Sequence, residues 1–329
     1  MEKELKNNLS LINVDEMKVL FLKYGVIVGF LILIVTATIL YPGFLSTTNI
    51  MNMYSQLAIV GVMSIGMTFV LLTGGLDMSV GGIYASSAVL YAIFANSMPI
   101  GVAMITTVVC GVAAGAFNGL LITRFRVTAF IATLGTGSIF TGIALLVSNA
   151  NPIFVQKEGF KWLGSGGLVG LPVSVILLFT LYIIAGIVLA FTVYGRSIYA
   201  VGGNPEASRL SGLKVKLLTS STYIISGACA SIAGLIIASR LGQGQANIGE
   251  TITLDVIAAV VIGGTSLAGG QGAIWRTVVG GSVLIALSNI FDSMALSPYW
   301  QSIFTGVIII AAVMFDFYTR SKLSKIGKA

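Results

Sequence analysis

Residues 172–193 read PVSVILLFTLYIIAGIVLAFTV and contain no charged side chain. About 20 predominantly apolar residues are enough for a helix to cross the hydrocarbon core of a bilayer. In lipid, a helix satisfies its backbone hydrogen bonds within its own segment, whereas an isolated strand cannot. This stretch therefore predicts a membrane-spanning helix, and it indicates the fold class of the chain around it.

The composition of the whole chain fits that class. Of 329 residues, 56% are hydrophobic and only 9% are charged, and the mean hydropathy is +1.00. About a quarter of the residues of an ordinary soluble domain are charged, so a soluble globular protein is excluded. The chain has no histidine, which removes histidine metal sites and the commonest general base. Cys110 and Cys229 lie in apolar stretches, which indicates two core thiols and no disulfide framework.

Further apolar stretches of similar length bring the predicted number of crossings to ten. The predicted spans are residues 25–41, 56–73, 78–95, 101–123, 128–147, 172–193, 217–238, 252–268, 274–291 and 300–318. The span at 252–268 is the weakest, because its apolar run ends at Ile262 and continues directly into Gly263 and Gly264. The predicted fold is an all-α polytopic membrane protein of about ten transmembrane helices, one of them short or broken.

The basic residues predict the orientation of the spans. With the N-terminus inside and the loops assigned alternately to the two sides, 15 of the 18 lysines and arginines fall on the cytoplasmic side. Only Lys157, Lys161 and Arg240 fall outside. Both termini are therefore predicted to be cytoplasmic. The predicted divisions are a cytoplasmic N-terminal segment at 1–24, a transmembrane domain at 25–318 and a basic cytoplasmic tail at 319–329. No basic block is dense enough to indicate nucleic-acid binding.

Glycine is unusually frequent, with 40 residues in the chain. Gly111, Gly115 and Gly119 recur every four residues along one face of the span at 101–123, which predicts close packing against another helix. Paired glycines also flank several predicted helix ends, where chain reversal needs a positive φ. These pairs are Gly74–Gly75, Gly81–Gly82, Gly202–Gly203, Gly263–Gly264 and Gly269–Gly270.

The sequence lacks the residues of an ATP-binding loop. Residues 264–271, GTSLAGGQ, have two glycines at the phosphate-loop spacing, but Gly270 and Gln271 replace the required Lys and Ser or Thr. The chain is therefore predicted to be no enzyme and to bind no cofactor or metal ion. If ATP powers its activity, another polypeptide must hydrolyse the ATP.

The acidic residues argue against an ion-coupled carrier, which usually places a carboxylate deep in a span. Asp77 lies where two spans meet and can cap a helix, and Asp255 lies in the first turn of the weak span. Either carboxylate could instead line a translocation route. An ion- or proton-coupled carrier of a small polar solute stays the alternative function, and a membrane scaffold or enzyme is the other.

The longest polar cytoplasmic stretch after the N-terminus is the predicted loop at residues 194–216. Its middle predicts a short helix, since Asn204 can cap it, Pro205 suits its first position and Gly212 can end it. Glu206 favours the positive end of the helix dipole. A helix of two turns is not stable alone, so a partner or the membrane surface must hold it.

Five segments of the chain resemble the ordered signature blocks of one protein family. They are Gly74–Gly81 (GGLDMSVG), Ala129–Gly135 (AFIATLG), Tyr194–Arg196 (YGR), Gly202–Gly212 (GGNPEASRLSG) and Leu254–Gly272 (LDVIAAVVIGGTSLAGGQG). The sequence is similar in these blocks to the membrane permease subunits of ribose-type ABC sugar importers. Five blocks in the correct order are more specific than any one of them, and the resemblance extends from about Tyr41 to Asp316.

The resemblance implies a permease for a monosaccharide such as ribose, in the bacterial plasma (inner) membrane. Two copies of such a permease, or close paralogues, sit on a pair of ABC ATPase subunits, which use ATP and Mg. An extracytoplasmic sugar-binding protein delivers the sugar. The residues that the resemblance assigns to ATPase coupling are Arg196, Gly202, Gly203, Asn204, Glu206, Arg209, Ser211 and Gly212.

Residues 240–250 are predicted to lie at the outer mouth and to form part of a gate. Their three glycines permit backbone changes, and their amides can bond a passing sugar without adding charge. The alternative is an ordinary flexible external loop. The residues predicted to line the path or its gate are Asp77, Asn118, Thr133, Gln243, Asp255 and Asn289.

Overall fold

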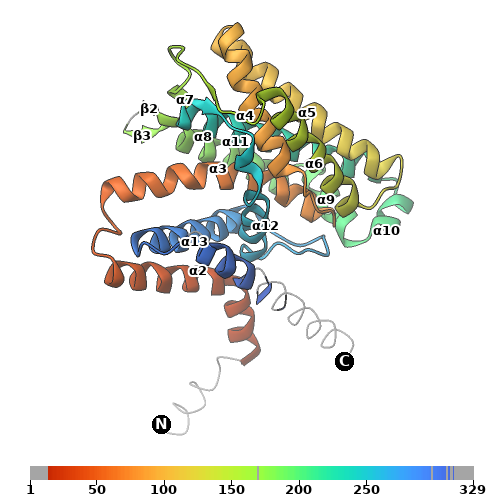
Figure 1. The fold of residues 1–329 in the computed structure, drawn as a ribbon. Coiled ribbons are helices and arrows are strands. Elements are labelled where there is room, and N and C mark those ends of the chain that lie inside the picture. Colours follow the sequence, from red (N-terminus) through yellow and green to blue (C-terminus); the bar gives the residue numbers. More distant parts are fainter. Residues whose placement is uncertain (1–13, 169, 298, 309, 312–313, 315–329) are drawn as a thin grey trace, which may run out of the picture.

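A computed structural model describes residues 14–168, 170–297, 299–308, 310–311 and 314. In that part of the chain, helices form a bundle, and the strands are only two residues long (Figure 1). The labelled helices are α2 (Val14–Leu40), α3 (Thr47–Leu72), α4 (Val80–Ser97), α5 (Ile100–Thr123), α6 (Ala129–Ser148), α7 (Trp162–Ser165), α8 (Val173–Phe191), α9 (Val193–Gly203), α10 (Pro205–Leu210), α11 (Val215–Leu241), α12 (Ile252–Ile262) and α13 (Ile274–Ser293), with a 3-10 turn η1 at Asn247–Gly249. Residues 299–308 are helical as well. Two antiparallel pairs join β1 (Ile153–Phe154) to β4 (Gln243–Gly244) and β2 (Gly167–Leu168) to β3 (Leu171–Pro172).

The helix lengths confirm an all-α polytopic membrane protein. Among the described residues, seven helices are long and apolar enough to cross a bilayer, namely α3, α4, α5, α6, α8, α11 and α13. Helix α12 has 11 residues. It is therefore only about 16 Å long, roughly half of a bilayer core, as expected for the weak span. Ten crossings and two cytoplasmic termini stay predictions, and residues 1–13 and the tail at 319–329 lie outside the described part.

Helix α11 lies at the centre of the bundle and packs on α3, α4 and α5. Glycines bring the backbones together. On α5, a Cβ added at Gly111 would overlap the side chain of Ser231, and one at Gly115 would overlap the carbonyl oxygen of Tyr223. Gly119 approaches Ser220 in the same way. The predicted packing face of this span is confirmed.

The paired glycines serve two different purposes. Four of them have positive φ, between 72° and 88°, as predicted for chain reversals: Gly74, Gly264, Gly269 and Gly270. The prediction was wrong for the other six, which have no positive φ; among them, Gly82 and Gly202 lie inside α4 and α9. Here glycine is needed because another backbone comes close. A Cβ at Gly82 would overlap the carbonyl oxygen of Gly137, and one at Gly202 would overlap that of Leu72.

Replacing Gly115 with Leu should destabilise the protein by about 1–3 kcal/mol, the usual cost of overpacking. The measurement is the thermal unfolding midpoint of the purified chain in detergent. Gly142→Leu on α6 is the matched control, because a Cβ at Gly142 meets no atom within 4 Å. Equal midpoints for the two variants would contradict the backbone contact between α5 and α11.

Candidate functional site

Helix α10 has the local structure that the sequence predicts. The Asn204 side chain caps it by accepting a hydrogen bond from the Ala207 N–H at 2.9 Å. Pro205 occupies the first turn, and Gly212 ends the turn after the helix with φ of +85°. Figure 1 shows α9 and α10 at the end of the bundle opposite α7 and the β2–β3 pair. The helix is thus presented at one end of the membrane domain.

The surface of α10 carries an ion pair. Arg209 donates hydrogen bonds to both carboxylate oxygens of Glu206, at 2.6 and 3.1 Å. Arg209 holds the pKa of the Glu206 carboxyl below its usual value, so this group is ionised at neutral pH. The two side chains are 62% and 66% exposed, and an exposed pair contributes little to stability. The pair and the exposed Leu210 beside it are therefore surface available to a partner.

The end of α9 is attached to two other segments at a contact that we call the Gly202 junction. It consists of Leu72 at the end of α3, Gly202 on α9 and Gly270 before α13. The Gly270 N–H donates to the Leu72 carbonyl oxygen at 2.9 Å. A Cβ at Gly202 would overlap that same oxygen and lie 2.5 Å from the Gly270 nitrogen. Three segments distant in sequence therefore meet backbone to backbone.

The structure places all eight residues predicted for ATPase coupling on α9, at the cap of α10, on α10 or in the turn that ends α10. Seven are exposed and Gly202 is half-buried; the exposed ones are Arg196, Gly203, Asn204, Glu206, Arg209, Ser211 and Gly212. They form one continuous element of the chain. Contact with an ATPase stays a prediction.

A second cluster is buried and joins the α3–α4 connection to three helices. We call it the Asp77 network; its members are Asp77, Ser79, Asn118, Thr136 and Ser226. The Asp77 carboxylate accepts hydrogen bonds from the Ser79 N–H at 3.0 Å, the Ser79 hydroxyl at 2.6 Å and the Ser226 hydroxyl at 2.7 Å. The Ser79 hydroxyl accepts from the Asn118 amide at 2.7 Å, and Asn118 accepts from Thr136 at 2.6 Å. Every member is buried.

Three of the six predicted path residues meet at this network. Asp77 and Asn118 are members, and Thr133 lies one turn from Thr136 and accepts the Met78 N–H at 2.9 Å. Each of these polar side chains bonds to another part of the chain. The arrangement can fix the α3–α4 connection against α5, α6 and α11.

The other three predicted path residues lie apart from the network and from one another. Gln243 is in β4, and Asp255 is on α12 beside a small hollow that α13 and residues 299–308 also line. Asn289 on α13 exchanges two hydrogen bonds with Asn49 on α3, at 2.8 and 2.9 Å. Their part in a path stays a prediction.

The predicted gate segment at 240–250 is packed along α4. Strand β4 pairs with β1, and Gly244 packs on Ala88. Farther along, Gly249 packs on Gly81 near the start of α4. The segment thus follows roughly 10 Å of α4, at the rise of a helix. Irregular backbone is tolerated within a membrane domain where protein surrounds it, and α12 begins directly after this segment.

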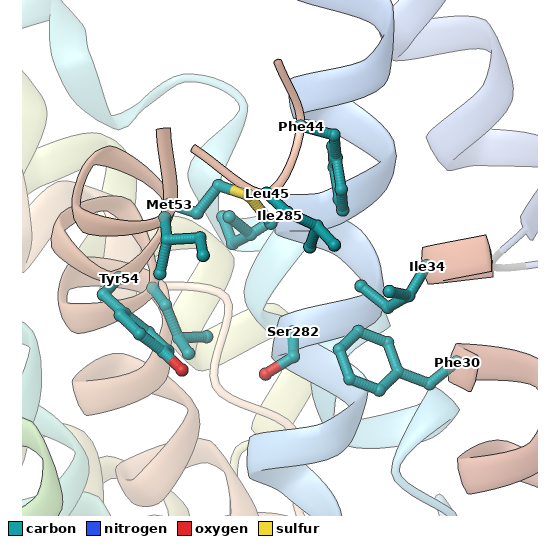
Figure 2. A pocket seen from close by; sticks show the side chains of 10 residues that line it. Phe30, Ile34, Phe44, Leu45, Met53, Tyr54, Ser282 and Ile285 are labelled. Carbon is teal, nitrogen blue, oxygen red and sulfur yellow. The ribbon is translucent and has the colours of Figure 1, made fainter. Parts of the chain in front are cut away.

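The hollow in Figure 2 lies among α2, α3 and α13 and has a volume of about 290 Å³. Aromatic and aliphatic side chains line most of it, among them Phe30, Ile34 and Met53. The hydroxyl of Ser282 donates to the Val278 carbonyl oxygen at 2.9 Å. None of the lining residues is charged. The hollow suits an apolar chain and not a sugar, which needs several hydrogen-bonding partners.

Comparison with known proteins identifies the family. The family model described as branched-chain amino acid transport system / permease component matches residues 49–313. The chain belongs to this permease family. It is 40% identical over 300 residues to the ribose import permease protein RbsC of Bacillus subtilis (strain 168), covering 89% of this chain and 92% of that protein.

Two further relatives have similar coverage. The ribose import permease protein RbsC of Escherichia coli (strain K12) is 37% identical over 295 residues, which is 88% of this chain and 92% of that protein. The L-arabinose transport system permease protein AraH of the same strain is 36% identical over 304 residues, 90% of each chain. The search of solved structures gives no significant match.

These findings confirm the resemblance to ribose-type permeases. Together with the seven apolar helices, they show that this permease is a multi-pass protein of the bacterial inner membrane. The family implies no catalytic role for the chain. The Gly202 junction and the Asp77 network were not predicted from the sequence. The sequence features that could have indicated them are the paired glycines for the junction and the polar residues within several spans for the network.

Replacing Asp77 with Asn should destabilise the permease by about 1–3 kcal/mol, because one amide oxygen replaces two carboxylate oxygens and an NH₂ group faces hydroxyl donors. The measurement is again the thermal unfolding midpoint in detergent. Glu158→Gln is the control, since Glu158 is an exposed carboxylate. An unchanged midpoint for Asp77→Asn would show that the carboxylate does not hold the network together.

Proposed function

We propose that this permease forms the translocation path of an ATP-driven importer for a monosaccharide such as ribose. The names of its relatives, two ribose import permeases and an arabinose transport permease, support the substrate class. The observation that carries the proposal is the Gly202 junction. An exposed helix of two turns is attached through it to the end of α3 and to the segment before α13.

In the proposed assembly, a separate ABC ATPase subunit docks on α9 and α10 and hydrolyses ATP with Mg. Two permease copies, or two close paralogues, stand side by side over two such subunits. ATP binding closes the ATPases and biases the permeases between inward-open and outward-open packings. A sugar-binding protein docks at the opposite end, where α7 and the β2–β3 pair lie (Figure 1).

The proposed path runs beside residues 240–250 and α12. A neutral sugar in transit needs hydrogen-bonding groups, and Gln243 and Asp255 lie on these two elements. Helix α12 begins after irregular backbone inside the bundle, as in transporters whose sites lie at broken helices. The Asp77 network, which includes Asn118, and the adjoining Thr133 would hold the wall of this path rigid. Asn289 would do the same between α3 and α13.

The proposed orientation is tested by thiol labelling of intact cells with an impermeant maleimide, after Cys110 and Cys229 are changed to Ser. A cysteine that replaces Lys157 should be labelled from outside. A cysteine that replaces Pro205 should be labelled only after the membrane is opened, because α10 is cytoplasmic in this proposal. Labelling of position 205 in sealed cells would refute the orientation.

The docking role is tested by two changes on α10. Glu206→Lys places like charge beside Arg209, and Gly212→Leu forces a side chain into a backbone with φ of +85°. Both variants should still enter the membrane, but neither should co-purify with the ATPase. Sugar uptake should fall at least about tenfold, the effect typical of losing a central contact in a protein–protein interface. Uptake is measured in proteoliposomes that contain the permease, its ATPase and the binding protein.

The control for these variants is Arg126→Glu, a charge reversal on the exposed connection between α5 and α6. It should retain ATPase binding.

Uptake by the unchanged complex should require ATP and should not depend on proton or sodium gradients. Uptake driven by an ion gradient without ATP would instead support the alternative of a secondary carrier.

A further inference from the structure

An apolar groove between α8 and α13 ends at a group of cationic and aromatic side chains. Its volume is about 780 Å³, and apolar side chains of the two helices line most of its length. At one end it is lined by Arg196 and Tyr199 of α9 and by Trp275 in the first turn of α13. The groove therefore joins an apolar slot to a charged and aromatic end.

A second guanidinium, that of Arg276, lies beside this end of the groove but is not part of its lining. The Arg276 guanidinium carbon is 5.3 Å from the centroid of the Trp275 ring. Its Nε atom is buried and has no hydrogen-bond partner among the described residues. In the described part of the chain, the salt bridge is that of Glu206 with Arg209, and none of the described carboxylates pairs with Arg196 or Arg276. Two arginines therefore lie at or beside this end of the groove, one of them in its lining.

We propose that an anionic phospholipid of the inner leaflet occupies this groove. One acyl chain would lie between α8 and α13, and the phosphate would accept hydrogen bonds from Arg196 and Arg276. Guanidinium groups match phosphate oxygens, and Trp and Tyr favour the headgroup level of a bilayer. Basic pockets between transmembrane helices on the cytoplasmic side are typical sites of such lipids. The inference rests on the proposed orientation but not on transport.

The hollow of Figure 2 provides a comparison within the same protein. It is also apolar and also lies between helices, but no charged residue lines it. An acyl chain there would have no preference for its headgroup. The two arginines therefore distinguish a lipid site from an ordinary gap between membrane helices.

A lipid in the groove would connect α9 to α13. Arg196 and Tyr199 belong to α9, and the Tyr199 hydroxyl donates to the Gly272 carbonyl oxygen before α13 at 3.0 Å. Trp275 and Arg276 belong to α13. The phosphate would join the same two elements as this hydrogen bond, so the lipid content of the membrane would influence how tightly α9 is held.

Lipid binding is measured by native mass spectrometry of the purified full-length permease in detergent, titrated with palmitoyl-oleoyl phosphatidylglycerol or phosphatidylcholine. The phosphatidylglycerol should bind more tightly. Arg276→Gln should weaken its binding by about fivefold, the effect expected for one basic residue near an anionic headgroup. Arg276→Lys keeps the charge and should retain most of the preference. Arg124→Gln, at an exposed arginine after α5, should change nothing.

A second variant tests the apolar part of the site. A Cβ at Gly186 would lie 3.5 Å from Ile274, an ordinary contact, so Gly186→Phe extends a ring into the groove. It should reduce binding of phosphatidylglycerol without loss of folded protein, as judged by an unchanged unfolding midpoint.

Equal binding of the two lipids, or equal effects of Arg276→Gln and Arg124→Gln, would overturn the proposal. A third outcome would also overturn it. If Gly186→Phe kept its lipid binding but no longer formed a permease dimer, the groove between α8 and α13 would be the contact surface for a second copy of the permease. The measurement needs no ATPase, so its failure is separate from failure of the transport function. A wrong orientation would be reported by labelling at position 205.

Discussion

Backbone groups buried in lipid must find their partners within the protein, and this constraint arranges the chain around α11. Glycines allow the neighbouring helices to touch it closely. A Cβ at Gly66 of α3 would lie 2.6 Å from the Ser226 Cα, and one at Gly234 of α11 would lie 2.6 Å from the Tyr84 carbonyl oxygen. With the glycine face of α5, these contacts surround α11 on three sides. Dispersion between close backbones replaces the hydrophobic driving force that is absent in lipid.

The Asp77 network depends on that frame. A buried carboxylate is costly unless donors surround it, and here Ser79 and Ser226 supply three hydrogen bonds. Ser226 can reach Asp77 because Gly66 lets α3 and α11 approach at the same level. The network then extends to α5 and α6 through Asn118 and Thr136. A fully satisfied polar network in a medium of low dielectric is rigid, so α3, α4, α5, α6 and α11 form one body around it.

The features that the sequence predicts are those set by local rules. Span lengths follow from apolar runs, and the limits of α10 follow from Asn204 and Gly212. The features that it misses are pairings between distant segments. Glycine is required both for positive φ and for close approach, so the sequence cannot tell whether Gly202 ends a helix or meets Leu72. Likewise, Ser226 lies 149 positions from Asp77, and no local pattern marks it as a partner. The packing of residues 240–250 along α4 is missed for the same reason.

The elements outside this rigid body are those through which motion can travel. At the Gly202 junction, α9 meets the loop after α12, and a Cβ at Gly263 in that loop would lie 2.7 Å from the Arg276 carbonyl oxygen of α13. Because these contacts are backbone to backbone, a displacement of α9 cannot be absorbed by side-chain rotation. Helix α12 has 11 residues and follows irregular backbone, so it can shift without breaking a full-length helix. A partner that docked at α10, as proposed, would thereby be connected to the C-terminal end of α12, while the Asp77 network would hold α3, α4, α5, α6 and α11 in place.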